Sequence, residues 1–307
     1  MRVALGKTDL QVHPLCLGGN VFGWSANAAQ SNDVLTAYES AGGNFIDTAD
    51  MYSRWHTGNI GGESETIIGD WMRTRGNRNE MVIATKVAKL GTRPGLSAAN
   101  IAAAAEDSLR RLGTDYIDIY YAHHDDEEIP LEESLTAFNA LVTAGKVRYL
   151  AASNYSAARL AEALKISREL GISKYLLLQP HYNAIVRNEY EGDLMATAVK
   201  EDIPVLPYFA LAAGFLTGKY QPGVTVDSVR AEDMPEYMND RGWAILNALT
   251  EIAHEENTST AAVALGWLRA QPGVVTPIAS ARTPEQLAQI LPVVELSAEQ
   301  VAKVNAL

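Results

Sequence analysis

The stretch Gly42-Gly-Asn-Phe-Ile-Asp-Thr-Ala-Asp-Met-Tyr-Ser-Arg54 passes within a few residues from apolar to ionisable side chains. Phe45 and Ile46 form a short apolar segment between two glycines and a polar run, which predicts a buried strand that ends in a loop. Asp47 then stands at the carboxyl end of that strand. In α/β proteins the catalytic residues come from this end of the strands. Partners of Asp47 are therefore expected at the same ends of the other strands.

Apolar segments of strand length alternate with segments of helical periodicity along the whole chain. The predicted strands are 15–17, 44–46, 81–85, 116–121, 147–151, 175–178, 203–206 and 274–278. The predicted helices are 34–40, 65–73, 101–112, 131–144, 157–170, 194–200, 243–255 and 261–268. Strand followed by helix, eight times over, predicts an α/β protein of the (β/α)8 TIM-barrel class rather than an open sheet.

The length of 307 residues allows two domains or one large barrel. No repeat of fixed period and no linker rich in proline or serine divides the chain, so residues 1–307 are predicted to form a single domain. Within it, residues 1–13 place apolar side chains around a Gly-Lys-Thr-Asp turn, which predicts an N-terminal β-hairpin. Two long connections, 56–62 and 221–240, follow predicted strands and should overhang the carboxyl-terminal face of the barrel.

Charge and composition exclude several classes of protein. The net charge of −12 disfavours binding to nucleic acid or to anionic membranes. No secretory signal and no apolar run of about 18 residues is present, so we expect a soluble, cytoplasmic protein without a membrane segment. The single cysteine, Cys16, excludes an internal disulfide and fits a buried thiol in a reducing compartment.

Three more predicted strands end in residues that carry chemistry. The segment 81–86 ends in Lys86, the segment 116–123 ends in His123, and the segment 147–154 ends in Ser153 and Asn154. A phenol such as that of Tyr52 has an ordinary pKa of about 10, and a nearby ammonium group is expected to lower it. Asp47 can hold Lys86 in place, and an imidazole can hydrogen-bond a bound carbonyl oxygen. This set suits protonation of an oxygen that becomes an alkoxide, which is half of a carbonyl reduction.

Each of these residues, taken alone, has a plain structural explanation. A strand-end aspartate often caps a turn, a strand-end lysine is usually solvated, and a tyrosine can simply pack. His123 has His124 beside it, and the alternation of side chains along a strand cannot decide which imidazole faces inward. Trp55, and less readily His56, is expected to line a substrate pocket. The remaining histidines and the acidic run 125–128 lack metal-ligand spacing, so no metal is predicted.

Several motifs occur together in one order: IDTADMYSRW with GGESE, IATKV, IDIYYAH, AASN, LQPHYN and YFALAAGFLTGKY. In this combination they resemble the aldo-keto reductase superfamily, from about residue 10 to the end. The resemblance implies one (β/α)8 barrel that reduces an aldehyde or ketone reversibly to the alcohol with a nicotinamide cofactor. It also implies a catalytic tetrad, in which Tyr52 is the general acid and Asp47, Lys86 and His123 assist, and it favours His123 over His124.

The resemblance further assigns the cofactor contacts. Ser153, Asn154 and Gln179 match the residues that bind the nicotinamide carboxamide, and Tyr208 matches the aromatic residue that stacks on the ring. Pyrophosphate contacts are implied at Leu211, Gly214, Leu216 and Lys219. Ser280 and Arg282 match a site for the 2′-phosphate and Gln286 one for the adenosine. A permanent cation such as Arg282 makes NADPH (or NADP+) the expected cofactor and NADH the less suitable one.

The chain departs from the family pattern at a few positions. Phe209 and Ala210 replace a common serine and proline, and Ile290 replaces a common adenine-binding asparagine. Potassium-channel β-subunits resemble the same family, so an NADPH-binding sensor or regulatory subunit is an alternative; the lack of an added terminal segment favours the enzyme. An alcohol or sugar dehydrogenase is a further alternative. A small carbonyl or alcohol is the expected partner, while its identity and the oligomeric state stay open.

Overall fold

The sheet of this protein is parallel and curls upon itself. The computed structural model describes residues 1–221, 223, 224, 226 and 229–307, so part of the predicted connection 221–240 (222, 225, 227 and 228) lies outside the described residues. In the described part, one sheet has the order β8–β7–β6–β5–β4–β3–β9. Its strands are β3 (Cys16–Gly18), β4 (Phe45–Asp47), β5 (Val82–Val87), β6 (Ile117–Ala122), β7 (Val147–Ser153), β8 (Tyr175–Gln179) and β9 (Ile278–Ala279).

The gap between β8 and β9 is closed by the segment that was predicted as the strand 203–206. It is extended, but it pairs only through single bridges, from Val205 to Leu178 and to Val274. Pro204 and Pro207 flank the middle of this segment, and a proline has no N–H to donate to a ladder. For the same reason the strand predicted at 274–278 is reduced, since Pro277 stands immediately before β9. The (β/α)8 prediction is confirmed, with its closing strands weakened by prolines.

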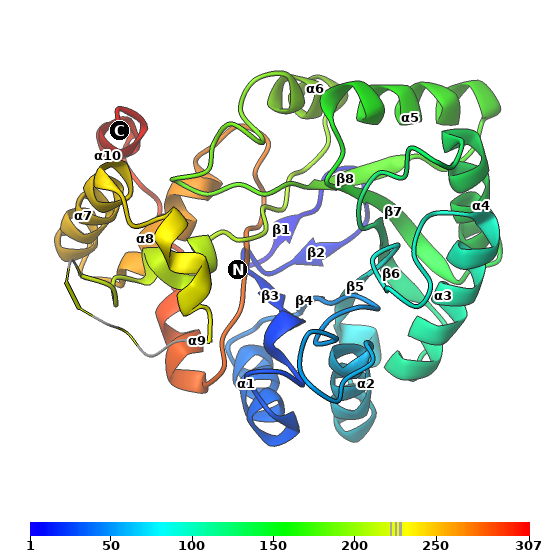
Figure 1. Cartoon of the computed structure of the whole chain (residues 1–307), viewed down its shortest axis with the longest axis horizontal. Helices are drawn as coiled ribbons and strands as arrows, with labels where there is room; N and C mark the ends of the chain where they lie inside the picture. Colours follow the sequence, from blue (N-terminus) through cyan, green and yellow to red (C-terminus); the bar gives the residue numbers. More distant parts are fainter. Residues whose placement is uncertain (222, 225, 227–228) are drawn as a thin grey trace.

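Helices surround the sheet on its outer side (Figure 1). The chain forms α1 (Ala28–Ser40), α2 (Glu63–Arg75), α3 (Ala98–Leu112), α4 (Leu131–Thr143), α5 (Ala157–Leu170), α6 (Asp193–Glu201), α7 (Asp240–Glu255) and α8 (Thr260–Arg269). Short 3-10 turns are η1 (Gly19–Val21), η2 (Arg78–Glu80), η3 (Ala212–Thr217) and η4 (Ala231–Glu236). Within the described ranges, no helix combines the length and the apolar character needed to cross a bilayer.

Local capping explains where several helices begin and end. Ser97 accepts a hydrogen bond from the Asn100 amide at the start of α3, and Gly113 ends that helix in the left-handed conformation. Gly171 ends α5 in the same way. The sequence pattern did not predict α9 (Pro284–Ile290) and α10 (Ala298–Asn305), which follow the last strand. Both are too short for a helical period to stand out.

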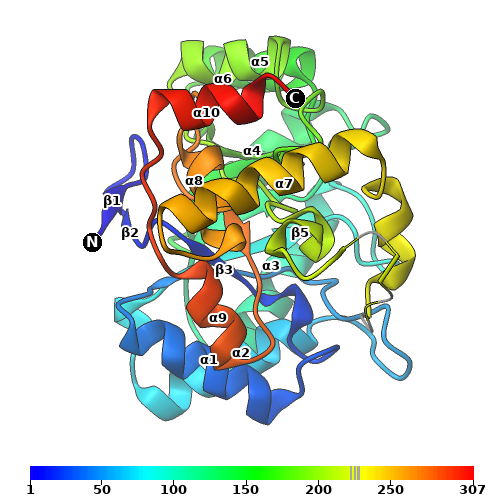
Figure 2. The same cartoon turned by 90° about the vertical axis from the view of Figure 1, so that its left-hand side faces the viewer.

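The N-terminal hairpin closes one end of the barrel. Its strands β1 (Val3–Ala4) and β2 (Gln11–Val12) pair in the antiparallel sense, as predicted. The hairpin contributes Leu5, Leu10 and Val12 to an interior cluster that also contains Cys16, Phe45, Val82, Ala84, Ile119, Tyr121, Ala151, Leu177, Leu206 and Ile278. Figure 2 shows the hairpin at one end of the molecule and the connection 56–62 and η4 at the other. The second end is the open one.

Candidate functional site

The strand register brings Asp47 and Lys86 to the open end of the barrel. Asp47 pairs with Ala84 of β5, and side chains alternate along a strand, so Lys86 points to the same side one step further along. Phe45 and Ala84, which precede them on this side, belong to the interior cluster. The barrel interior thus changes from apolar to ionised at the carboxyl ends of β4 and β5.

Lys86 is the centre of a buried polar group. Its ammonium donates to Asp47 at 2.7 and 2.6 Å, to the carbonyl oxygen of Thr48 at 2.9 Å and to the Tyr52 hydroxyl at 2.9 Å. Lys86 is 0% and Asp47 2% exposed. The Gln179 amide donates to the same carboxylate at 2.9 Å. A buried ion pair is tolerated when hydrogen bonds fill its remaining capacity, and this one meets that condition.

The pKa of Tyr52 corrects one expectation from the sequence. Lys86 was expected to lower it, whereas burial raises the pKa of Tyr52 well above its ordinary value and Asp47 raises it further. The Tyr52 hydroxyl donates to Asp47 at 3.2 Å, a bond that only the protonated phenol can make. Burial in turn lowers the pKa of Lys86, and Asp47 opposes this shift. Tyr52 is therefore a protonated phenol at neutral pH, the form that can donate a proton.

The two neighbouring histidines have different environments. The His123 ring lies 6.0 Å from the Tyr52 ring, nearly perpendicular to it, and borders the cavity described below. Burial holds the pKa of His123 well below 6.5, and the charges of Lys86 and Lys89 lower it further. The imidazole is thus neutral. His124 instead contacts the backbone carbonyl of Asp125, so the structure places His123 beside Tyr52.

A cavity of about 670 Å³ opens at this end of the barrel. It is bordered by most residues that the sequence singled out: Asp47, Tyr52, Trp55, His123, Ser153, Asn154, Gln179, Tyr208, Leu211, Gly214, Lys219, Ser280, Arg282 and Gln286. Two others do not border it. Lys86 lies beneath its floor, and Leu216 is fully buried in the outer core, with its N–H bonded to the Leu211 carbonyl. The side chain of Leu216 therefore packs in the core, and the assignment of this residue to the pyrophosphate segment stays a prediction.

Polar groups predicted to meet the nicotinamide are bonded to one another. Asn154 donates to the His123 carbonyl at 2.8 Å and to the Ser153 hydroxyl at 3.1 Å, and it accepts from the Tyr208 hydroxyl at 2.7 Å. Asn154 has a φ of 56°, a left-handed backbone conformation that asparagine tolerates better than most residues. His181 stacks on Tyr208 with ring centres 5.4 Å apart. These bonds fix the amide and the ring at the cavity wall.

The far part of the cavity suits an anionic ligand. Ser280 donates to Asn20 at 2.6 Å, and the backbone N–H of Arg282 donates to Gln286 at 2.9 Å, immediately before α9 begins. Among the described lining residues the cations are Lys89, Lys219, Arg230 and Arg282, whereas the only carboxylate is Asp47, which Lys86 neutralises. In a chain of net charge −12, this local excess of cations fits the phosphates of a dinucleotide.

Sequence reasoning missed several residues that border the cavity, among them Asn20, Met51, Lys89, Phe209 and Arg230. Each lies in a segment that follows an expected strand, which was the only signal available. Arg230 lies over the rings of Trp24 and Phe209, at 5.7 and 5.6 Å. Trp24 also packs edge-on against Trp55, which is 6.1 Å from the Tyr52 ring. The cavity mouth is therefore largely aromatic, and His56 does not border it.

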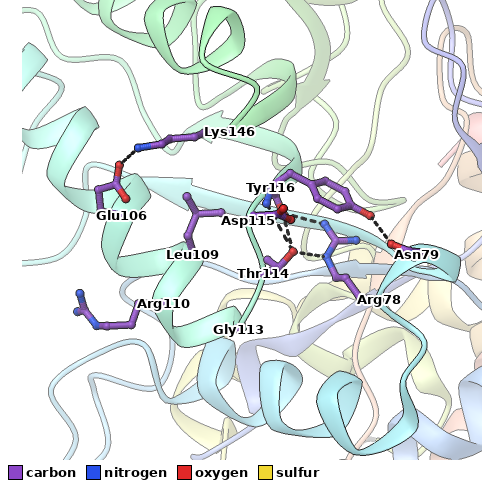
Figure 3. A pocket seen from close by; sticks show the side chains of 10 residues that line it. All are labelled: Arg78, Asn79, Glu106, Leu109, Arg110, Gly113, Thr114, Asp115, Tyr116 and Lys146. Carbon is purple, nitrogen blue, oxygen red and sulfur yellow. Dashed lines mark hydrogen bonds and ion pairs between the residues drawn. The ribbon is translucent and has the colours of Figure 1, made fainter.

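A second hollow, of about 750 Å³, lies at the opposite end, where the chain enters β5, β6 and β7 (Figure 3). Its basic side chains already have partners, and Arg110 pairs with Asp107. Arg78 donates to Thr114, to two backbone carbonyls and to Asp118, and it stacks on Tyr116. Lys146 pairs with Glu106. Since its cations are neutralised and none of the tetrad reaches it, this hollow has no equivalent chemistry.

Comparison with known proteins gives the same family as the motifs. A model of the aldo/keto reductase family matches residues 14–307. A probable voltage-gated potassium channel subunit beta of Oryza sativa is 30% identical over 98% of this chain and 94% of its own length. The uncharacterized oxidoreductase YrpG of Bacillus subtilis is 31% identical over 96% and 91%. Norsolorinic acid reductase stcV of Emericella nidulans is 30% identical over 99% and 80%.

Proposed function

The chain belongs to the aldo/keto reductase family, and we propose that it is an NADPH-dependent oxidoreductase that reduces an aldehyde or ketone to the alcohol. The observation that carries this proposal is the bonded group of Asp47, Lys86 and Tyr52, which stands under a cavity rich in cations. A single buried thiol, Cys16, suits a reducing compartment. We therefore also propose the cytoplasm as its location.

The residues divide the chemistry of proton transfer among themselves. When bound, the reduced nicotinamide supplies hydride to the carbonyl carbon. Tyr52, held as a neutral phenol, donates its proton to the carbonyl oxygen as negative charge develops there. Lys86, at 2.9 Å, stabilises the phenolate that remains, and Asp47 keeps the ammonium charged and in place. His123, neutral and beside Tyr52, orients the carbonyl oxygen by a hydrogen bond.

The preference for NADPH rests on the far part of the cavity. The Arg282 guanidinium cannot lose its charge near neutral pH and matches a phosphate in two parallel hydrogen bonds. Ser280 and Gln286 stand beside it on the same wall. The nicotinamide carboxamide would be held by Ser153, Asn154 and Gln179. Some hydrogen bonds that these residues make with one another would then be replaced by hydrogen bonds to the carboxamide. NADH lacks the 2′-phosphate and would leave Arg282 unpaired.

A carbonyl panel with NADPH tests the proposal. We expect oxidation of NADPH over many turnovers with at least one class among small aldehydes, sugars, quinones and steroids, and slow reversal with the matching alcohol and NADP+. Tyr52→Phe removes only the hydroxyl, so it should lower kcat by at least about 100-fold, the usual contribution of a general acid, and spare NADPH binding. Near-normal turnover by that variant would show that the proton comes from elsewhere.

The relative named a potassium channel subunit beta supports a second candidate function. In that case the protein binds NADPH as a sensor and acts on another protein. Single-turnover kinetics separate the two candidates. Tight retention of NADPH with one slow oxidation event per protein supports the sensor, and repeated turnover supports the enzyme. Repeated turnover only with an alcohol and NADP+ would identify a dehydrogenase acting in the oxidative direction.

A further inference from the structure

Lys89 enters the cavity from an unusual turn of the backbone. β5 ends at Val87, and Ala88 then has a φ of 117°, which a residue with a Cβ atom rarely adopts. Ala88 is buried, and its carbonyl accepts the Gly95 amide at 2.9 Å. Backbone strain of this kind costs roughly 1–3 kcal/mol and is often found at functional sites. Here its consequence is that the chain turns and the next side chain, Lys89, borders the cavity.

The charge of Lys89 is not neutralised within the described part of the chain. Its ammonium makes no hydrogen bond or ion pair there, and the one carboxylate on the cavity wall, Asp47, is bonded to Lys86. Lys89 is close enough to the catalytic group for its charge to lower the pKa of His123. An exposed cation without a partner in the described residues thus borders the same cavity as His123, the residue that would orient the carbonyl oxygen.

The other cations of the cavity have different places. Lys219 follows η3, and Arg282 precedes α9, both in the part assigned to the cofactor phosphates. Arg230 lies over Trp24 and Phe209 at the aromatic mouth. Lys89 alone among them follows β5, the strand that carries Lys86. Its position matches a substrate held against Tyr52 and His123 better than it matches the cofactor.

We propose that Lys89 is a specificity-determining residue that binds the anionic group of the substrate, so that the preferred substrates are aldehydes or ketones that carry a carboxylate. This inference rests on the proposed function, because it concerns the substrate of the same site. The rings of Tyr52, Trp55 and Phe209 border the cavity as well, and they fit a planar apolar spacer between the carbonyl and the carboxylate. A charge-assisted hydrogen bond from Lys89 would then set both the affinity for the substrate and its orientation in the cavity.

A matched pair of substrates tests this inference. 4-Carboxybenzaldehyde and its neutral methyl ester share the ring and the aldehyde, and the ester replaces the negative charge by one methyl group. With NADPH saturating, we expect kcat/KM for the acid to exceed that for the ester by about 10-fold or more. Lys89→Met should lower kcat/KM for the acid by about 10- to 100-fold and change the ester by less than about 3-fold. Lys89→Arg should keep most of the preference.

Lys174→Met is the matched control, because it removes the same charge from the opposite end of the barrel, just before β8. This variant should leave kcat/KM unchanged for both the acid and the ester. The inference is overturned if kcat/KM of the wild-type protein is the same for the acid and the ester. It is also overturned if Lys89→Met lowers kcat/KM for the acid and for the ester by the same factor. If Lys174→Met lowers kcat/KM for the acid as much as Lys89→Met does, the inference is overturned as well, since the effect then comes from the overall charge of the protein.

A binding measurement separates this inference from the proposed function. 4-(Hydroxymethyl)benzoate and its methyl ester are titrated calorimetrically into protein loaded with NADPH, with which an alcohol cannot react. If wild-type protein binds the acid more tightly than the ester and Lys89→Met does not, the anion subsite is supported, whether or not either aldehyde is reduced. A lack of reduction would count against the proposed function alone. Equal binding of acid and ester by wild-type protein contradicts the subsite even if both aldehydes are reduced.

Discussion

At the scale of single residues, Asp50 shows how much an ionisable side chain depends on its surroundings. It lies three positions after Asp47, yet both of its carboxylate oxygens are buried without a hydrogen-bond partner in the described part of the chain. Burial, and then the charge of Glu65, raise the pKa of Asp50 to about 7, although Arg111 and Arg93 oppose this. Glu65 is itself bonded to Arg111 at 2.6 Å. Asp50 is thus a buried carboxyl group without an ion-pair partner in the described part of the chain.

Asp50 should make the folded state less stable as the pH rises. Its pKa is higher in the folded than in the unfolded chain, so the folded state holds the extra proton, and the cost grows from about pH 4 to about pH 7. Asp50→Asn removes the charge. Relative to wild type, we expect its free energy of unfolding to rise by roughly 2–4 kcal/mol between pH 4.5 and pH 8. Urea denaturation at several pH values measures this difference.

Asp33→Asn is the control for this measurement, because it removes an exposed charge from α1. The difference in the free energy of unfolding between Asp33→Asn and wild type should stay nearly constant over the same pH range. Parallel stability curves for wild type and Asp50→Asn would contradict the raised pKa of Asp50.

At the scale of elements, the N-terminal hairpin is a plug and not part of the candidate site. Leu10 is 4% exposed and belongs to the interior cluster of the barrel, and the hairpin lies at the end of the molecule opposite the connection 56–62 (Figure 2). Leu10→Ala should therefore lower the free energy of unfolding by roughly 2–5 kcal/mol, through lost burial and the cavity left behind. Values of kcat and KM measured well below the new melting temperature should stay within about 2-fold of wild type.

Leu170→Ala is the matched control for the hairpin variant. Leu170 ends α5 and is 45% exposed, so the same substitution should cost less than about 1 kcal/mol. A loss of activity in Leu10→Ala at a temperature where the protein is folded would show that the hairpin also shapes the open end.

The closing segment shows where an element cannot be predicted from its pattern. Residues 203–206 have the apolar character of a strand, yet Pro204 and Pro207 limit the segment to single bridges. It still donates at both sides, from Leu206 to Leu178 and from Val205 to Gly273, each at 2.8 Å. A periodic apolar pattern records burial, whereas the ladder needs N–H groups in register, and prolines remove them.

At the scale of the whole molecule, the cavity joins distant parts of the chain. Its wall includes Gly18 after the hairpin and Gln289 in α9. A ligand that binds there stabilises only the folded barrel, by about 2.7 kcal/mol when it is present at 100 times its Kd. NADPH should therefore raise the melting temperature of the whole protein in one cooperative transition.

The comparison of NADPH with NADH tests the place of Arg282. At equal concentration NADPH should raise the melting temperature more than NADH, because only NADPH carries the 2′-phosphate. In Arg282→Met this difference should largely disappear, while the shift with NADH stays close to that of wild type. Differential scanning fluorimetry measures all four shifts. If Arg282→Met reduces both shifts equally, Arg282 contacts a group that the two cofactors share.

The sequence by itself determined the class of fold, the hairpin and most helix ends, because apolar periodicity and capping residues act over a few neighbouring positions. Ser97 and Gly113 are examples, and both stand where they were predicted. It also named part of the cavity lining, through strand ends and through the family resemblance. The roles of these residues in chemistry remain predictions that the variants above test.

Only the tertiary structure decided which groups are charged and which reach the cavity. The pKa of Tyr52 is raised by burial and by Asp47, and the side chain of Leu216 packs in the outer core and does not border the cavity. Lys89 enters the cavity because Ala88 takes a left-handed conformation. Protonation and exposure depend on groups that lie far apart in the chain and meet only when the barrel closes, so no local pattern of residues could have shown them.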